Sequence, residues 1–206
     1  MHILVAIPYR AGTNPHFIER ARELAGRLNG RHTYDVQMWE NIAPVFSGKY
    51  QQNAWARNKM VDLFLKNHDF VFWPDVDIVD YPADLIDQLA PDDGRITAPV
   101  TYIEKLPNGG WFYDTGGFIQ DGKTTAMYRG IINPQNLDHV PMDAVGCNAL
   151  IPAWLYRDGL RYWPEGDEVE HVSFCREAAQ RGVKSYAAVN VLCYHACLPH
   201  YGEAWR

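Results

Sequence analysis

A short apolar run that ends in two aspartates constrains this chain more than any other stretch. The run Phe70-Val71-Phe72-Trp73 is followed by Pro74 and then by Asp75-Val76-Asp77. An unbroken apolar run of this length predicts a buried strand of a parallel sheet. Side chains two positions apart in an extended segment point to the same side. We therefore expect Asp75 and Asp77 to emerge together at the carboxyl end of this strand, the edge at which open α/β sheets bind ligands.

These two aspartates predict a site for a divalent cation. Neighbouring carboxylates repel each other and are costly to desolvate unless a positive charge lies between them. Oxygen ligands suit Mn²⁺ or Mg²⁺, so we expect one of these ions as a cofactor at Asp75 and Asp77. The alternative is a pair of solvated aspartates at a strand end, and the Asp-x-Asp spacing alone does not separate the two.

The composition indicates one globular domain over residues 1–206. The chain is 47% hydrophobic and 13% aromatic, which is ample for a packed core, and its net charge of −6 argues against a broadly basic nucleic-acid-binding surface. No signal peptide is recognisable, and no apolar run reaches the ~20 residues that span a membrane. We therefore expect a soluble, cytoplasmic protein without a membrane span, in which the four cysteines stay reduced.

Alternating hydrophobic patterns predict an α/β fold with a central, mostly parallel sheet flanked by helices. Turn and cap signals divide the chain, for example the helix start at Asn14-Pro15 and the helix stop at Gly182. The expected elements, in order, are a strand over 3–7 that ends at Pro8, a helix over 15–28, a strand over 34–39, a helix over 51–66, the central strand, a helix after Pro82, a strand over 95–100, an apolar strand near 150, a helix over 169–181 and a last strand over 185–193.

Residues 104–140 interrupt this alternation. They contain two Gly-Gly pairs, scattered polar residues and the aromatic run Trp111-Phe112-Tyr113. The pattern predicts long loops or a hairpin rather than another β-α unit. Loops of this length in a compact domain usually carry function or move. We therefore expect a loop-rich insertion with a role in function.

Several segments carry a recognisable order of motifs. Ala56-Arg57-Asn58 precedes the apolar strand and Asp75-Val76-Asp77, the segment from Glu170 to Ala178 is followed by Gly182, and His195 comes about a dozen residues later. These segments resemble the A-R-N…D-x-D arrangement, the E-D-x-x-F-C-x-R-A…G helix and the C-terminal metal-binding histidine of GT-A glycosyltransferases. Members of that family transfer sugars from nucleotide-sugar donors.

The segment that precedes the Glu170 helix resembles a narrower group. It reads, in order, Asp143-Ala144-Val145-Gly146, Leu150-Ile151, Gly159 and Trp163-Pro164. This order is similar to the D-x-V-G-G…L-L…G…F-P run of the fungal mannan-polymerase-type mannosyltransferases. Two residues depart from the family patterns, because Cys147 replaces the second glycine and His171 replaces the aspartate of E-D. The resemblance covers nearly the whole chain except residues 104–140.

The resemblance implies a single GT-A (Rossmann-like) domain and a set of site residues. It implies that Asp75, Asp77 and His195 hold the metal ion, and that Glu170 and His171 are the catalytic residues. The donor-binding residues are then Tyr9, Arg10, Arg57, Asp75 and Asp143. The implied donor is a UDP- or GDP-sugar. Because the mannosyltransferases retain the configuration of the sugar, we expect transfer to a hydroxyl acceptor with retention.

The acceptor is less defined than the donor. We expect residues 104–140 to form the acceptor side, with Trp111, Phe112 and Tyr113 available to stack on a sugar or a base. The acceptor can be a glycan, a small molecule, a protein or a modified DNA base, the last as for some bacteriophage glycosyltransferases, which act in the host cytoplasm. The sequence does not rank these acceptors.

Other interpretations remain open. A sugar-phosphate nucleotidyltransferase also uses a carboxylate-bound metal, but Val5–Gly12 lacks the Gly-rich phosphate loop with a basic residue that it needs. A non-catalytic nucleotide- or carbohydrate-binding module fits the aromatic content. Arg10 and Arg57 also fit surface positions. A structural zinc site competes for His195, since Cys193, His195, Cys197 and His200 lie within eight residues, although buried free cysteine explains the thiols as well.

Overall fold

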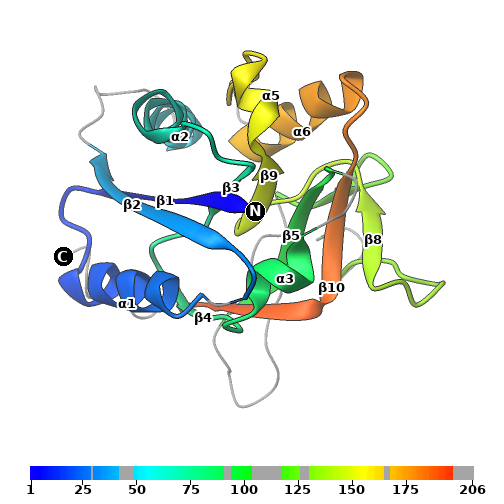
Figure 1. Ribbon diagram of the computed structural model, residues 1–206. Coiled ribbons are helices and arrows are strands. Elements are labelled where there is room, and N and C mark those ends of the chain that lie inside the picture. The colour runs from blue at the N-terminus through cyan, green and yellow to red at the C-terminus, as the bar shows by residue number, and fades with distance from the viewer. Residues whose placement is uncertain are drawn as a thin grey trace.

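A twisted sheet with helices on both faces forms the core of the protein (Figure 1). The computed structural model describes residues 1–28, 30–41, 49–90, 94–103, 117–125, 130–164 and 168–196. The strands of the main sheet are β1 (His2–Arg10), β2 (Thr33–Asn41), β3 (Phe70–Trp73), β4 (Ile78–Asp80), β5 (Ile96–Ile103), β8 (His139–Met142), β9 (Ala149–Pro152) and β10 (Ser185–His195). The helices are α1 (Pro15–Gly26), α2 (Lys49–Phe64), α3 (Leu85–Leu89), α5 (Ala153–Arg157) and α6 (Glu170–Gln180).

The strand order is β2-β1-β3-β9-β5-β10-β4, and β8 pairs with β10 on the edge opposite β5. Strands β1, β2, β3, β5 and β10 run in one direction, whereas β4, β8 and β9 run against them. The expectation of an α/β fold with a mostly parallel sheet is therefore confirmed. The sequence pattern did not predict that β9 lies between β3 and β5 and opposes both.

The two faces of the sheet bury alternate residues of each strand. In β1, Leu4 and Ala6 belong to the cluster that packs under α2, α5 and α6, whereas Ile3, Val5 and Ile7 face the cluster under α1 and α3. In Figure 1, α2, α5 and α6 lie above the sheet, and α1 and α3 lie below it. Each aliphatic side chain of this size contributes about 1.5–3 kcal/mol on full burial. Helices on both faces thus account for the continuous apolar run in β3.

The first strand is longer than the pattern predicted. Pro8 does not end β1, which continues to Arg10 and pairs with β2 along its whole length. On its other edge, β1 pairs with β3 at Ile3, Leu4 and Val5, so Pro8 lies beyond that ladder. A proline is tolerated where its missing N–H faces no partner strand. The extension carries Tyr9 and Arg10 past the end of β3.

The central apolar stretch divides into two strands. Strand β3 ends at Trp73, and Ile78–Asp80 forms the separate strand β4, which pairs antiparallel with the end of β10. The N–H of Ile78 donates to the carbonyl of Asp75 at 3.2 Å, which closes the turn between the strands. Asp75 and Asp77 therefore lie in a tight turn at the carboxyl edge of the sheet.

Strand β10 turns a corner on its way to this edge. Its pairing with β5 shifts between Ala188 and Leu192, where β10 contains extra residues opposite Pro99 and Val100. Pro99 has no N–H to offer the ladder, so the irregularity falls where one hydrogen bond is missing in any case. The first part of β10 pairs with β8 and the last part with β4, and Figure 1 shows the strand changing direction between them.

The expected loop-rich insertion is only partly loop. A hairpin of β6 (Ile119–Gln120) and β7 (Lys123–Thr124) is present, as the glycine pattern predicted, but His139–Met142 is a strand of the main sheet. That part of the prediction was wrong because β8 gains its partner, β10, from a distant part of the sequence. Residues 104–116 and 126–129, which include Trp111, Phe112 and Tyr113, lie outside the described residues.

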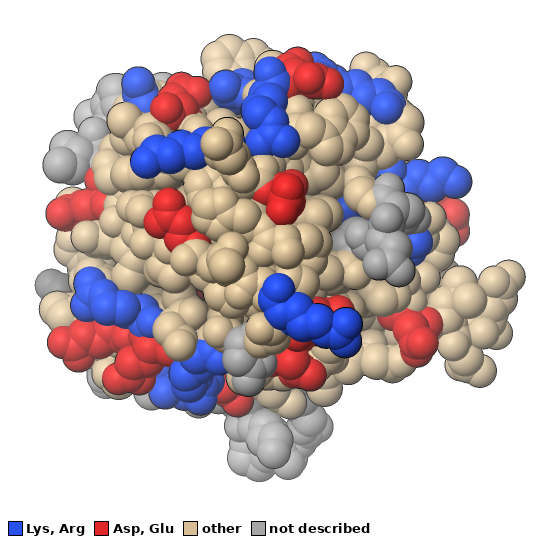
Figure 2. All heavy atoms as spheres, viewed as in Figure 1, with Lys and Arg blue, Asp and Glu red and all other residues tan. Residues whose placement is uncertain are grey.

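Charged side chains are mixed over the visible surface. Figure 2 shows lysine and arginine interspersed with aspartate and glutamate on one face of the molecule. None of the helices in the described ranges has both the length and the apolar character that crossing a bilayer requires.

Candidate functional site

Asp75, Asp77 and His195 meet at the carboxyl edge of the sheet. The aspartates come from the β3–β4 turn and the histidine is the last residue of β10. One potential ligand atom from each residue lies within 4.8 Å of the others, and no other such group of three occurs in the described part of the chain. The His195 side chain is 1% exposed, whereas those of Asp77 and Asp75 are 17% and 28% exposed. The structure thus brings together the three residues that were expected to hold a metal ion.

The backbone fixes this meeting point. Residue His195 pairs with Ile78 of β4, and the N–H of Ala196 donates to the carbonyl oxygen of Asp77 at 2.9 Å. Strand β4 therefore holds the end of β10 against the turn that carries both aspartates. The geometry depends on the corner in β10, because that corner redirects the strand from β8 to β4.

The imidazole of His195 has a defined orientation. Its Nδ1 lies 2.9 Å from the carbonyl oxygen of Ala196 and its Nε2 lies 2.9 Å from Oδ1 of Asp77. The carbonyl can only accept, so Nδ1 carries a proton and Nε2 is the atom that a metal would share with the aspartates. Burial lowers the pKa of His195, but the hydrogen bond and charge of Asp77, the carbonyl of Ala196 and the charge of Asp75 outweigh burial and raise the pKa overall. Two carboxylates and one oriented imidazole suit Mn²⁺ or Mg²⁺.

Arg57 lies beneath this group rather than on the surface. It projects from α2 and is only 4% exposed. Its Nη2 donates to Oδ1 of Asp75 at 3.4 Å, and its Nε forms an ion pair with Oε1 of Glu170 at 3.5 Å. Burial lowers the pKa of Arg57, but its electrostatic surroundings, including Glu170 and Asp75, raise it overall. Arg57 is therefore a buried, permanently charged side chain, and the surface interpretation was wrong.

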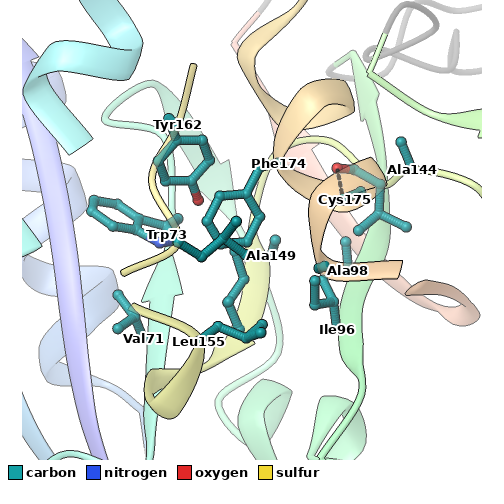
Figure 3. Packing of buried hydrophobic residues seen from close by; sticks show 14 of the residues in the cluster. Val71, Trp73, Ile96, Ala98, Ala144, Ala149, Leu155, Tyr162, Phe174 and Cys175 are labelled. Carbon is teal, nitrogen blue, oxygen red and sulfur yellow. Dashed lines mark hydrogen bonds between the residues drawn. The ribbon is translucent and has the colours of Figure 1, made fainter. Parts of the chain in front are cut away.

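Aromatic side chains form the floor under Arg57. The guanidinium carbon lies 5.1 Å from the ring centre of Trp73 and 5.6 Å from that of Tyr162. Tyr162 stacks on Phe174 at 4.4 Å, and Figure 3 shows Trp73, Tyr162 and Phe174 packed beside one another. Tyr156 accepts from Nε1 of Trp73 at 2.8 Å and shares a 3.0 Å hydrogen bond with the Tyr162 hydroxyl. Burial raises the pKa of both tyrosines, so they stay neutral.

Asn58, which follows Arg57, holds the floor in place. Its Nδ2 donates to the carbonyl of Tyr162 and its Oδ1 accepts from the N–H of Tyr162, both at 2.9 Å. The sequence interpretation missed the roles of Asn58, Tyr162 and Trp73. A signal existed, since all three lie in or beside the quoted motifs, but a helical pattern does not reveal which distant backbone an asparagine binds.

Glu170 and His171 lie at the start of α6, next to Arg57. Glu170 is 1% exposed and His171 is 7% exposed. The Nε2 of His171 lies 3.5 Å from Nη2 of Arg57 and 3.7 Å from Oε1 of Glu170. The structure therefore brings both expected catalytic residues to the metal group through their contact with Arg57.

The remaining donor-binding candidates divide into two groups. Tyr9 and Arg10 end β1, and Nη2 of Arg10 donates to Oδ1 of Asn53, one helical turn before Arg57, at 3.2 Å. Asp143 is exposed and accepts a hydrogen bond from the N–H of Gly122 in the β6–β7 hairpin at 2.7 Å. Its neighbour Met142 pairs with Ser185, at the opposite end of β10 from His195. The structure thus brings Arg10 to the helix that carries Arg57 but places Asp143 away from the metal group.

Cys193 is packed in the core. It is fully buried in the apolar cluster under α1 and α3, and burial raises the pKa of its thiol. Cys147 and Cys175 are also buried free thiols. Cys197 and His200 of the alternative zinc site lie outside the described residues, and His195 points to Asp77.

Comparison with known proteins identifies the fold. No family model matches the sequence, and no curated protein sequence is significantly similar. Among solved structures, GalNAc-T7 with UDP, GalNAc and Mn²⁺ matches with a TM-score of 0.62 and 14% identity over 96% of this chain and 44% of that chain. The mannosyltransferase PcManGT from Pyrobaculum calidifontis, in complex with GDP-Man and Mn²⁺, matches with a TM-score of 0.54 and 14% identity over 94% and 56%. The chain has the fold of GT-A glycosyltransferases.

A third solved structure is similar to this chain in length as well as in fold. A197 from STIV matches with a TM-score of 0.55 and 16% identity over 95% of this chain and 85% of that chain. The chain spans about half the length of the two GT-A transferases but most of the length of A197. The comparisons thus confirm the expected GT-A fold class over nearly the whole chain.

Proposed function

We propose that this protein is a metal-dependent glycosyltransferase that moves a sugar from a nucleotide-diphosphate sugar to a hydroxyl acceptor. The observation that carries the proposal is the convergence of Asp75, Asp77 and His195 at the carboxyl edge of a GT-A sheet. Two solved structures of the same fold hold a nucleotide or nucleotide sugar together with Mn²⁺. The donor is then a UDP- or GDP-sugar, and Mn²⁺ or Mg²⁺ is the cofactor.

The residues of the candidate site have different roles in donor binding and in departure of the leaving group. Asp75, Asp77 and His195 hold the divalent ion, which when bound offsets the negative charge that develops on the nucleotide diphosphate. Tyr9 and Arg10 flank the base and phosphates beyond the end of β3. Asp143 stays a candidate for donor binding on the side of the β6–β7 hairpin, where its carboxylate accepts from the N–H of Gly122.

The surroundings of Glu170 and His171 favour retention. In the transfer, the bond between the anomeric carbon and the phosphate oxygen breaks, a bond to the acceptor oxygen forms, and the acceptor proton must go to a base. Glu170 and His171 are both buried and both contact Arg57, so neither side chain is exposed to a bound acceptor. If the leaving phosphate takes the proton on the same face, no side-chain base is needed, and Glu170 supports the positive charge that develops at the sugar.

Donor assays separate this proposal from the alternatives. The protein is incubated with UDP- and GDP-sugars and Mn²⁺, and nucleotide diphosphate, free sugar and pyrophosphate are quantified. Slow release of sugar and nucleotide diphosphate supports the transferase. Pyrophosphate release supports a nucleotidyltransferase, and binding without turnover supports a non-catalytic module.

The stereochemical assignment and the acceptor need a second experiment. Once the donor is known, glycans, small metabolites, proteins and modified DNA bases are screened as acceptors. The anomeric proton coupling of the product made from an α-linked donor then reports the configuration. A β-linked product contradicts retention and makes Glu170 or His171 the first candidate for the base.

A further inference from the structure

The guanidinium of Arg57 is enclosed by the protein. The rings of Trp73 and Tyr162 both lie close to it, with ring centres 5.1 and 5.6 Å from the guanidinium carbon. Its Nε and Nη1 atoms are buried and make no hydrogen bond within the described ranges. Nε faces Glu170 and Nη2 faces Asp75, so protein carboxylates engage two of the three guanidinium nitrogens.

Arg57 forms ion pairs with two carboxylates that come from different segments of the chain. Nη2 approaches Asp75 at 3.4 Å from one direction, and Nε approaches Glu170 at 3.5 Å from another. Asp75 comes from the β3–β4 turn and Glu170 from the start of α6. Glu170 is 1% exposed, and a buried carboxylate is strongly destabilised when it loses its cation. Arg57 therefore links Asp75, a candidate metal ligand, to the buried carboxylate of Glu170.

We propose that Arg57 is a positioning residue, which holds Asp75 for the metal ion and Glu170 for the sugar and does not itself contact the nucleotide. This inference rests on the proposed function, because the metal ion belongs to that function. It replaces the donor-binding role that the family resemblance implies for Arg57. The role requires arginine, because a planar guanidinium can pair in two directions while its faces contact aromatic rings, whereas the ammonium of lysine is a compact point charge.

Metal titration without nucleotide tests the proposal directly. Free Mn²⁺ is followed by electron paramagnetic resonance in wild type, Arg57→Lys and Arg57→Gln. Loss of a residue that supports a metal ligand typically weakens metal binding by about 10–100-fold, and we expect a loss in this range for both variants. Arg161→Lys is the matched control, because Arg161 pairs with Asp62 at 3.1 Å on the partly exposed side of the same helix, and it should bind Mn²⁺ like wild type.

Nucleotide binding at saturating Mn²⁺ distinguishes positioning from direct contact. UDP and GDP are titrated calorimetrically into the same proteins with the metal site filled. If Arg57 acts through Asp75, the nucleotide affinity of Arg57→Lys stays within about threefold of wild type. The proposal is wrong if Mn²⁺ binding is unchanged while nucleotide binding at saturating Mn²⁺ falls tenfold or more.

A double-mutant cycle with Asp75→Asn locates the effect. Because the two residues act on one ligand position, the losses in Mn²⁺ affinity caused by Arg57→Lys and Asp75→Asn should not add, and additive losses contradict the proposal. If neither Arg57 variant folds by circular dichroism, Arg57 is a structural cation of the core and the proposal is likewise wrong. If wild type itself binds no Mn²⁺, it is the proposed function that fails.

Discussion

The imidazole of His195 lies between two acceptors, the carbonyl oxygen of Ala196 and the carboxylate of Asp77, each at 2.9 Å. Both ring nitrogens can therefore donate when the site holds no metal, and the pKa of His195 is raised above its ordinary value of 6.5. A metal ion and the second proton compete for the same atom, Nε2. This competition at one residue makes the pH dependence of the site predictable.

We predict opposite pH trends for the metal-free and metal-bound protein. A raised pKa in the folded state stabilises the fold below pH 6.5, and this contribution is lost as the pH rises through the raised pKa of His195. The thermal midpoint of the metal-free protein should therefore fall across that window. Mn²⁺ affinity should instead rise with pH, up to about tenfold per unit below the raised pKa, because the proton must leave first.

The His195 trends have a matched control. His195→Gln cannot titrate and should flatten both curves when midpoints are measured by calorimetry at several pH values. Parallel pH curves with and without Mn²⁺ in wild type would remove Nε2 of His195 from the metal site.

Asp77→Asn should abolish Mn²⁺ binding and the metal-dependent part of UDP or GDP affinity. The amide keeps the shape of the side chain but removes the charge, so the fold should persist. Relief of repulsion from Asp75 alone would stabilise the metal-free protein, but the 2.9 Å contact with buried His195 is lost as well. We therefore expect a lower thermal midpoint below pH 6.5, the ordinary pKa of histidine.

Cys193→Ser is the control for Asp77→Asn. Cys193 is buried in the core, so the hydroxyl should lower stability without changing Mn²⁺ affinity in a calorimetric titration. Stoichiometric zinc in the purified wild type that disappears in Cys193→Ser would show instead that the cysteines form a metal site.

Helix α2 connects the site to the segment that follows α5. Asn58 holds both polar backbone groups of Tyr162, and Asp62, one turn later, pairs with Arg161. This side of the helix thus binds the extended chain that places the Tyr162 ring under Arg57. The element acts as a frame for the floor of the site, whereas its opposite residues pack on the sheet.

Asn58→Ala should therefore loosen the floor. It leaves the N–H and the carbonyl of Tyr162 without their 2.9 Å partners, at a cost of about 1–3 kcal/mol for each buried group that stays unpaired. Urea unfolding should show a lower midpoint with an unchanged slope. Lys59→Ala, at the next and exposed position of the helix, should change the free energy of unfolding by less than about 0.5 kcal/mol. Equal effects of the two substitutions would contradict the role of Asn58.

At the scale of the whole molecule, the metal group lies where distant segments of the chain meet. The β3–β4 turn, the end of β10 and the start of α6 all contribute to it or contact it through Arg57. A ligand bound there contacts the folded arrangement and has no equivalent in the unfolded chain. Binding should thus stabilise the complete domain rather than one element.

Mn²⁺ together with UDP or GDP should raise the thermal midpoint of the whole domain in a single transition. At a ligand concentration 100 times the dissociation constant, the free energy of unfolding rises by about 2.7 kcal/mol. Scanning calorimetry should show a shift with the correct nucleotide and Mn²⁺, and no shift for Asp77→Asn. A nucleotide shift that persists in EDTA would contradict metal-dependent binding.

Several features could be predicted from the sequence because they depend only on neighbouring residues. The apolar run forms β3, and Asp75 and Asp77 follow its end at Trp73 by two and four positions, so the sequence places them at the carboxyl edge of the sheet. The cap at Asn14 is an equally local effect, since its side chain accepts from the N–H of His16 at 2.9 Å. The order of motifs also indicated the GT-A fold, which the structural comparisons confirm.

Which residues meet at the site depends on contacts that form only when the chain folds. The inward direction of Arg57 depends on His171, 114 positions away, and on Glu170. The arrival of His195 depends on the corner in β10 and its pairing with β4, and the position of Asp143 depends on the pairing of β8 with β10. Hydrophobic periodicity reports which face of an element is buried, but not which distant element covers that face. Contacts between segments far apart in the chain are fixed only when the strands pair and the side chains pack.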